Sequence, residues 1–100
     1  MTAEQILRAA AERLRSHGWT KEAYGSWDGP CCIVGAIAVA SGVRPGPLAD
    51  YPSSLEAAKV VGEVVGTGIP HFNDHHCRSI HDAIAALEIA ADLAAPEWKP

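Results

Sequence analysis

The chain has 100 residues, about the length of one domain, and nearly half are apolar, so it can bury a modest core without disulfides or metal. Its formal net charge is −4, and its Lys and Arg residues are scattered, which disfavours direct nucleic-acid binding. Three cysteines, two of them adjacent, argue against a disulfide-rich secreted scaffold. With no signal-peptide pattern and no bilayer-spanning apolar run, we expect a cytoplasmic protein without a membrane segment.

Residues 3–17 are predicted to form an amphipathic helix. Thr2 and Gln5 have the spacing of a capping box, and Gly18 stands where a helix needs a left-handed C-terminal residue. Apolar residues recur on one stripe of this helix, at positions 6, 7, 10 and 14. The segment 19–30 that follows is predicted to be a loop, whose aromatic side chains close one end of the core.

Residues 31–40 form an uninterrupted apolar run between a Gly-Pro turn and Ser41-Gly42. The length of the run, its alanines and the following glycine favour a buried helix, whereas its β-branched residues favour a strand. We predict the helix and keep the strand as the alternative. Gly35 in mid-helix predicts the close approach of a neighbouring helix or aromatic ring.

A Pro-rich connector over residues 43–51 precedes a third predicted helix. Ser53 and Glu56 have capping-box spacing, and Pro52 is expected to stand just outside the helix. Its inner stripe is predicted to contain Leu55, Ala58, Val61 (or Gly62) and Val65.

Residues 69–77 are predicted to form a second polar loop. Ser79 is expected to cap a last helix over residues 80–94. The buried side of that helix is predicted to include Ile80, Ala83, Ile84, Leu87, Ala91 and Leu93. Residues 95–100 are expected to be a flexible tail. The fold is therefore predicted to be all-α, one compact domain over residues 1–100 with about four helices around a buried central helix. An α/β fold with residues 31–40 as a strand is the alternative.

Several short motifs occur in a characteristic order. They are Gly18-Trp19-Thr20, Cys32-x-x-Gly35-Ala36 and Phe72-Asn73-Asp74 followed by Arg78-Ser79. In this order the chain resembles DUF6197, a family of small uncharacterised proteins of actinobacteria and their phages. Family members carry Trp where this chain has Cys31 and Phe72. The resemblance implies a helical fold and an actinobacterial or phage setting, and it implies no reaction.

A structural role is predicted for the residues of these motifs. Asn73 and Asp74 readily hydrogen-bond local backbone, and Asp74 could pair with Arg78 four residues later. We expect them to dock the second loop beside the buried helix, with Phe72 inserted into the core. The full set of motif residues is Trp19, Cys32, Gly35, Phe72, Asn73, Asp74 and Arg78.

Metal-ligating residue types are concentrated near the second loop. Zinc takes four Cys, His or acidic ligands, often as closely spaced pairs. The candidates are His71, His75, His76, Cys77 and His81, and zinc is the metal they would hold. The alternative is a polar loop with solvated imidazoles and no cofactor, because no Cys-x2-Cys pair is present.

A cysteine nucleophile is a third possibility. Cys31 and Cys32 would open a buried helix, whose N-terminus favours the thiolate. His75, or a neighbouring His, would then act as the base of a small cysteine hydrolase. The alternative is that both cysteines are small core residues.

Three tryptophans are many for a chain of this length. An exposed Trp27 or Trp98 would be an anchor for a partner protein, because Trp dominates binding hot spots. The leading hypothesis from the sequence is a small non-enzymatic protein that binds a host protein or a second copy of itself, with a homodimer possible.

Overall fold

The structure is a computed structural model that describes residues 1–48 and 50–96. Its elements are α1 (Ala3–His17), α2 (Ile33–Ala40), α3 (Pro52–Val65), α4 (Ile69–His71), the π-helical turn η1 (Phe72–His76) and α5 (Ile80–Ala94). Within these residues there is no strand, only isolated β-bridges that Cys31 makes with Trp19 and Gly25. The prediction of an all-α fold is confirmed, and the alternative of a strand over residues 31–40 is wrong.

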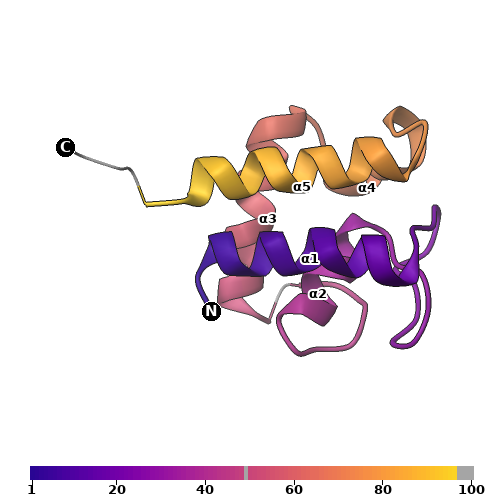
Figure 1. Ribbon diagram of the computed structural model, residues 1–100, viewed down its shortest axis with the longest axis horizontal. Helices are drawn as coiled ribbons and strands as arrows, with labels where there is room; N and C mark the ends of the chain where they lie inside the picture. Colours follow the sequence, from indigo (N-terminus) through magenta and orange to yellow (C-terminus); the bar gives the residue numbers. More distant parts are fainter. Residues whose placement is uncertain (49, 97–100) are drawn as a thin grey trace.

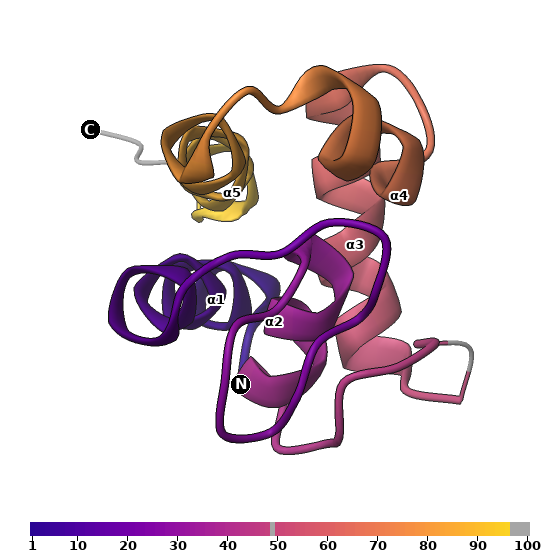
Figure 2. The same ribbon diagram turned by 90° about the vertical axis from the view of Figure 1, so that its right-hand side faces the viewer.

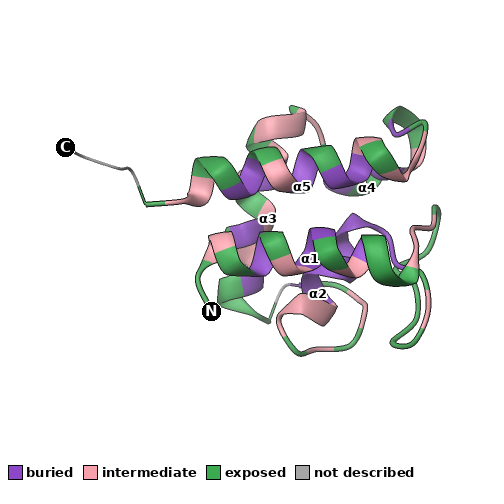
Figure 3. Cartoon of the chain, in the orientation of Figure 1, coloured by how far each residue is buried: buried purple, intermediate pink, exposed green. Residues whose placement is uncertain are grey.

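Helices α1 and α5 run antiparallel along the length of the molecule, and α3 crosses both of them (Figure 1). Helix α2 packs between α1 and α3, as the end-on view shows (Figure 2). Every residue of α2 from Ile33 to Ala38 is buried, and α1 buries its inner face against both α2 and α5 (Figure 3). The predicted buried helix is therefore present, and it packs against both α1 and α3.

The bounds of α1 and α5 agree with the sequence prediction. The Thr2–Gln5 capping box is present on α1, and Gly18 has a positive φ of 93°. Ser79 is the N-cap residue of α5, but its side chain makes no capping hydrogen bond. Leu93, predicted to be buried, is 64% exposed because it lies on the outward face of α5 with Ile89, whereas Ala90 and Ala91 in the same turns are fully buried.

Helix α2 begins two residues later than predicted. Cys32 is its N-cap residue, and the Cys32 sulfur accepts a hydrogen bond from the Gly35 N–H at 3.3 Å. Cys31 is outside the helix, where its N–H donates to the Gly18 carbonyl at 3.2 Å and its carbonyl accepts from the Thr20 N–H at 3.1 Å. Because Cys31 forms hydrogen bonds with the backbone of the preceding loop, α2 begins only at Ile33.

The start of α3 differs from the prediction. Pro52 lies in the first turn of the helix, with Tyr51 as an N-cap residue that makes no side-chain hydrogen bond, so the expected Ser53 cap is wrong. Proline suits this position because its fixed φ is helical and its missing N–H needs no partner. The fully buried residues of α3 are Ser54, Ala57 and Val61. Ser54 is satisfied in the core by donating to the Ser41 hydroxyl at 2.7 Å.

The second predicted loop is helical. Residues 69–71 form one turn of α4, which continues into η1, and the Cys77 N–H donates to the Phe72 carbonyl at 3.0 Å, five residues back. This turn buries Ile69, Asn73 and Cys77, while Phe72 is half-buried against the core. Polar composition predicted a loop, but the inward-facing residues recur every four positions and give the segment one buried face.

The structure describes the chain as far as residue 96 at its C-terminal end. The predicted tail over residues 95–100 falls outside the described residues from position 97 onward, and so does Trp98. Among the helices that the structure describes, none has both the length and the apolar character required to cross a bilayer.

Candidate functional site

Asn73 is buried at the meeting point of three segments. Its side-chain oxygen accepts hydrogen bonds from the Trp19 indole N–H at 2.8 Å and from the Ile33 N–H at 3.0 Å. Its side-chain nitrogen donates to the Thr20 carbonyl at 3.1 Å and to Asp74 Oδ1 at 2.9 Å. Asn73 is 1% exposed, and its side chain accepts two hydrogen bonds and donates two, which is the full capacity of an amide. It therefore joins η1 to the first loop and to the start of α2.

Asp74 continues this network toward the surface. Its Oδ1 atom accepts from the Glu22 N–H at 2.9 Å as well as from Asn73. These two donors hold the pKa of Asp74 below its ordinary value, so the carboxylate is charged at neutral pH. Glu22 has a φ of 63°, an uncommon value for a residue with a side chain. The loop is thus held in a specific conformation beside Asp74.

Arg78 does not form the predicted pair with Asp74. The Arg78 guanidinium lies 3.7 Å from Asp82 Oδ2, and the Arg78 backbone N–H donates a hydrogen bond to the same oxygen at 2.9 Å. The difference follows from η1, which ends at His76 before the chain turns into α5. Asp82 lies in the first turn of α5 and is the acid that reaches Arg78.

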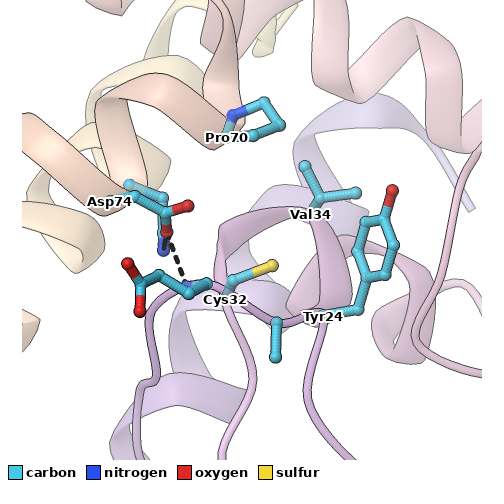
Figure 4. Close-up of a pocket in the computed structure, with 8 residues that line it drawn as sticks. Tyr24, Cys32, Val34, Pro70 and Asp74 are labelled. Atoms are coloured by element: carbon cyan, nitrogen blue, oxygen red, sulfur yellow. Dashed lines mark hydrogen bonds between the residues drawn. The ribbon is translucent and has the colours of Figure 1, made fainter.

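A cavity of about 290 Å³ lies beside this network. It is lined by Glu22, Ala23, Tyr24, Cys32, Val34, Pro70, Asn73 and Asp74. Figure 4 shows the Cys32 sulfur and one Asp74 oxygen turned toward the space between Pro70 and Val34, with the Tyr24 ring at the side. The sequence did not reveal this cavity, because its walls come from the first loop, α2 and the α4–η1 segment.

The cysteine side chains are buried and protonated. Burial raises the pKa of both Cys31 and Cys32, and it outweighs the Gly35 N–H that would favour a Cys32 thiolate. Cys31 is fully buried, and its thiol donates to the Ser26 carbonyl at 3.5 Å. No imidazole lines the Cys32 cavity among the described residues. The geometry therefore provides neither the thiolate nor the base of the hydrolase hypothesis, and His75 is an exposed residue of η1.

Cys77 offers a test of this burial through the pH dependence of stability. Burial raises its pKa from the model-peptide value of 9.0 to about 11. Between these two pH values the unfolded chain loses the thiol proton and the folded chain keeps it, so rising pH favours unfolding. We expect the free energy of unfolding to fall across this interval, and to fall less steeply in Cys77→Ala. Urea denaturation of both proteins from about pH 8 to about pH 11 measures the two slopes; equal slopes would contradict the burial of a neutral Cys77.

Three of the predicted metal ligands lie together on the surface. The ring centroid of His71 is 4.9 Å from that of His75 and 5.0 Å from that of His76. The π-helical turn explains this contact, because it places residues four and five positions apart on one face. Cys77 is turned into the core and His81 is exposed on α5. Among the described residues, no group of three or more His, Cys, Asp or Glu side chains has an arrangement that could hold a metal ion.

Arg13 fixes the first loop from the side of α1. Its guanidinium donates to the carbonyl oxygens of Ser26 at 3.2 Å and Gly29 at 3.0 Å, and also to that of Trp27. Trp27 itself is 47% exposed and Tyr24 is 41% exposed. This role of Arg13 could not be predicted from the sequence, because its three acceptors are backbone carbonyls.

Comparison with known proteins places the chain in a family. Residues 1–93 match a family of unknown function, DUF6197. The chain belongs to the DUF6197 family. The resemblance predicted from the motifs is thereby confirmed. No curated protein and no solved structure matches the chain. For this DUF6197 protein, function is therefore argued from the geometry of its own residues.

Proposed function

We propose that this DUF6197 protein is a small, non-enzymatic interaction protein that binds another protein through the loop of residues 18–31. The single observation that carries this proposal is the exposure of Trp27 on a loop held in one conformation. The partner is a host protein or a second copy of the chain, and the setting is the cytoplasm of an actinobacterium or of a cell infected by one of its phages.

Preorganisation of the loop supports an anchoring role for Trp27. Arg13 holds the carbonyls around Trp27, and Cys31 forms the isolated bridges that close the loop. An exposed aromatic ring on a fixed backbone loses little conformational entropy on binding, so more of its burial energy appears as affinity. Tyr24, on the same loop, adds a second amphipathic ring.

The charges near the two rings indicate the kind of partner surface. Glu22 and Asp28 are exposed on this loop, and the Asp74 carboxylate is hydrogen-bonded to the Glu22 backbone. With a formal net charge of −4, the chain favours a partner face that carries basic residues around an apolar pocket. Association with such a face is expected to be faster at low salt.

Affinity capture of the full chain tests this proposal, followed by light scattering of the purified protein and of any complex. We expect either an equimolar complex or a defined self-association, and we expect Trp27→Ala to weaken it by at least about 2 kcal/mol. Leu93→Ala is the matched control, because Leu93 is also a large exposed apolar residue but lies on α5.

Two outcomes would contradict the proposal. One is the recovery of neither an equimolar complex nor a self-associated species from cells that express the protein. The other is an equal effect of Trp27→Ala and Leu93→Ala, with both variants showing the circular dichroism of the parent protein. The second result would indicate nonspecific apolar contact rather than recognition by the loop.

A further inference from the structure

The cavity beside Asn73 has one charged wall and several apolar walls. Val34, Pro70 and Tyr24 supply apolar surface, and Asp74 supplies a carboxylate at one side. Its volume of about 290 Å³ is at the lower end of the range for small-molecule sites, and it suits a single side chain or a fragment of similar size. Few polar groups on mostly apolar walls are typical of a binding site.

Asp74 has one oxygen free for a ligand. The Oδ1 atom accepts both of the hydrogen bonds described above, and no hydrogen bond within residues 1–48 and 50–96 engages Oδ2. In Figure 4 the oxygen without dashed lines is turned into the cavity. The donors on Oδ1 keep the carboxylate charged and fix its direction, so the free oxygen is presented as an oriented negative charge.

We infer that this cavity binds a primary ammonium or guanidinium group carried on a short aliphatic stem. The cationic head donates to Asp74 Oδ2, and the stem packs against Val34 and Pro70. The Tyr24 ring, on the side of the cavity away from Asp74, adds apolar surface for the stem. A lysine or arginine side chain of a partner protein has this chemistry, and so does a free alkylamine.

The surrounding charges are compatible with a cationic ligand. Lys21 and His75 are close enough to Asp74 to act on its charge, but neither forms an ion pair with it within the described part of the chain. The Lys21 ammonium instead lies 5.4 Å from the centroid of the Trp19 ring. Cys32 contributes a neutral thiol, and Glu22 adds a second acidic residue to the lining. These charges therefore disfavour binding of an anion in the cavity, and they leave the Asp74 carboxylate free to pair with a cationic ligand.

Titration of the isolated, ¹⁵N-labelled protein tests the inference without a partner. The probes are n-butylammonium, its neutral analogue n-butanol, and a capped peptide with one central lysine. We expect saturable shifts of the Glu22, Cys32 and Gly35 amides with butylammonium, at about millimolar affinity, and binding of butanol at least about tenfold weaker. Tighter binding of the peptide would identify a partner's side chain as the source of the cation, and tighter binding of the free amine would identify a small molecule.

Asp74→Asn and Asp28→Asn are the paired variants. The first keeps an oxygen that can accept from the Glu22 N–H and from Asn73 but removes the charge, and the second removes an exposed carboxylate elsewhere on the same loop. We expect Asp74→Asn to weaken butylammonium at least about tenfold and Asp28→Asn to leave it unchanged.

Three results would overturn the inference: no saturable shift with butylammonium, equal binding of butanol, or equal loss in both variants. The test is separate from that of the proposed function. Binding of butylammonium that depends on Asp74 supports the inference even if no protein complex is recovered. A complex that depends on Trp27, without butylammonium binding, would keep the proposed function and reject this site.

Discussion

Replacing Asn73 with alanine is expected to lower the free energy of unfolding by about 3 to 5 kcal/mol. The substitution leaves the Trp19 indole N–H, the Ile33 N–H and the Thr20 carbonyl without the side-chain partner that Asn73, itself 1% exposed, provides. Each buried polar group left unpaired costs about 1 to 3 kcal/mol, and the lost side-chain volume adds a cavity. Urea denaturation followed by circular dichroism measures the change.

Trp19→Phe is the matched control for this prediction. It removes a single donor and keeps most of the ring, and the Asn73 oxygen still accepts from the Ile33 N–H. We expect it to cost about 1 kcal/mol. If Asn73→Ala proved no more destabilising than Trp19→Phe, the four hydrogen bonds of Asn73 would not be the connection that joins η1 to α2.

Gly35→Ala is expected to destabilise the protein by about 2 to 3 kcal/mol, although alanine is the better helix former by about 1 kcal/mol. A Cβ atom at this position would lie 1.9 Å from the Tyr24 carbonyl oxygen and 2.9 Å from its carbonyl carbon. The Tyr24 carbonyl also accepts a hydrogen bond from the Cys32 N–H at 3.2 Å. The loop must move away from α2, and that bond is lost.

Gly62→Ala on α3 is the control with the opposite expected sign. Apart from the neighbouring backbone of α3 itself, no atom of the described residues lies within 4 Å of a Cβ built at Gly62, and the position is inside a helix. We expect a gain of about 0.5 to 1 kcal/mol from the reduced freedom of the unfolded chain. Thermal and urea denaturation of the two variants measures both effects. A gain in stability for Gly35→Ala would show that Tyr24 does not hold its backbone against α2.

The same contact links stability to the cavity. Tyr24 and Cys32 both line the cavity, and both flank the point where Gly35 allows the loop to approach α2. Gly35 predicted that another part of the chain approaches α2 closely, and we expected that part to be a neighbouring helix or an aromatic ring. The structure places a backbone carbonyl there. Every residue has a backbone carbonyl, so a contact of this kind does not depend on the residue type at that position. The sequence shows only the glycine that the contact requires on the opposite side.

Local patterns in the sequence determined the regular parts of this protein. The amphipathic periodicity predicted α1 and α5 with the bounds that the structure has, because the spacing of apolar residues and the residues before each helix are local properties. The apolar run at residues 31–40 predicted the buried central helix, since an uncharged segment of that length must be covered on all sides.

Only the tertiary structure decided the start of α2, the helical form of residues 69–76 and the position of the cavity. Asn73 bonds to groups 40, 53 and 54 residues away, at Ile33, Thr20 and Trp19. The conformation of η1 is stabilised by those distant partners, and its polar composition alone predicted a loop. The candidate site could not be predicted for the same reason: its walls belong to three segments that become neighbours only when the core has formed.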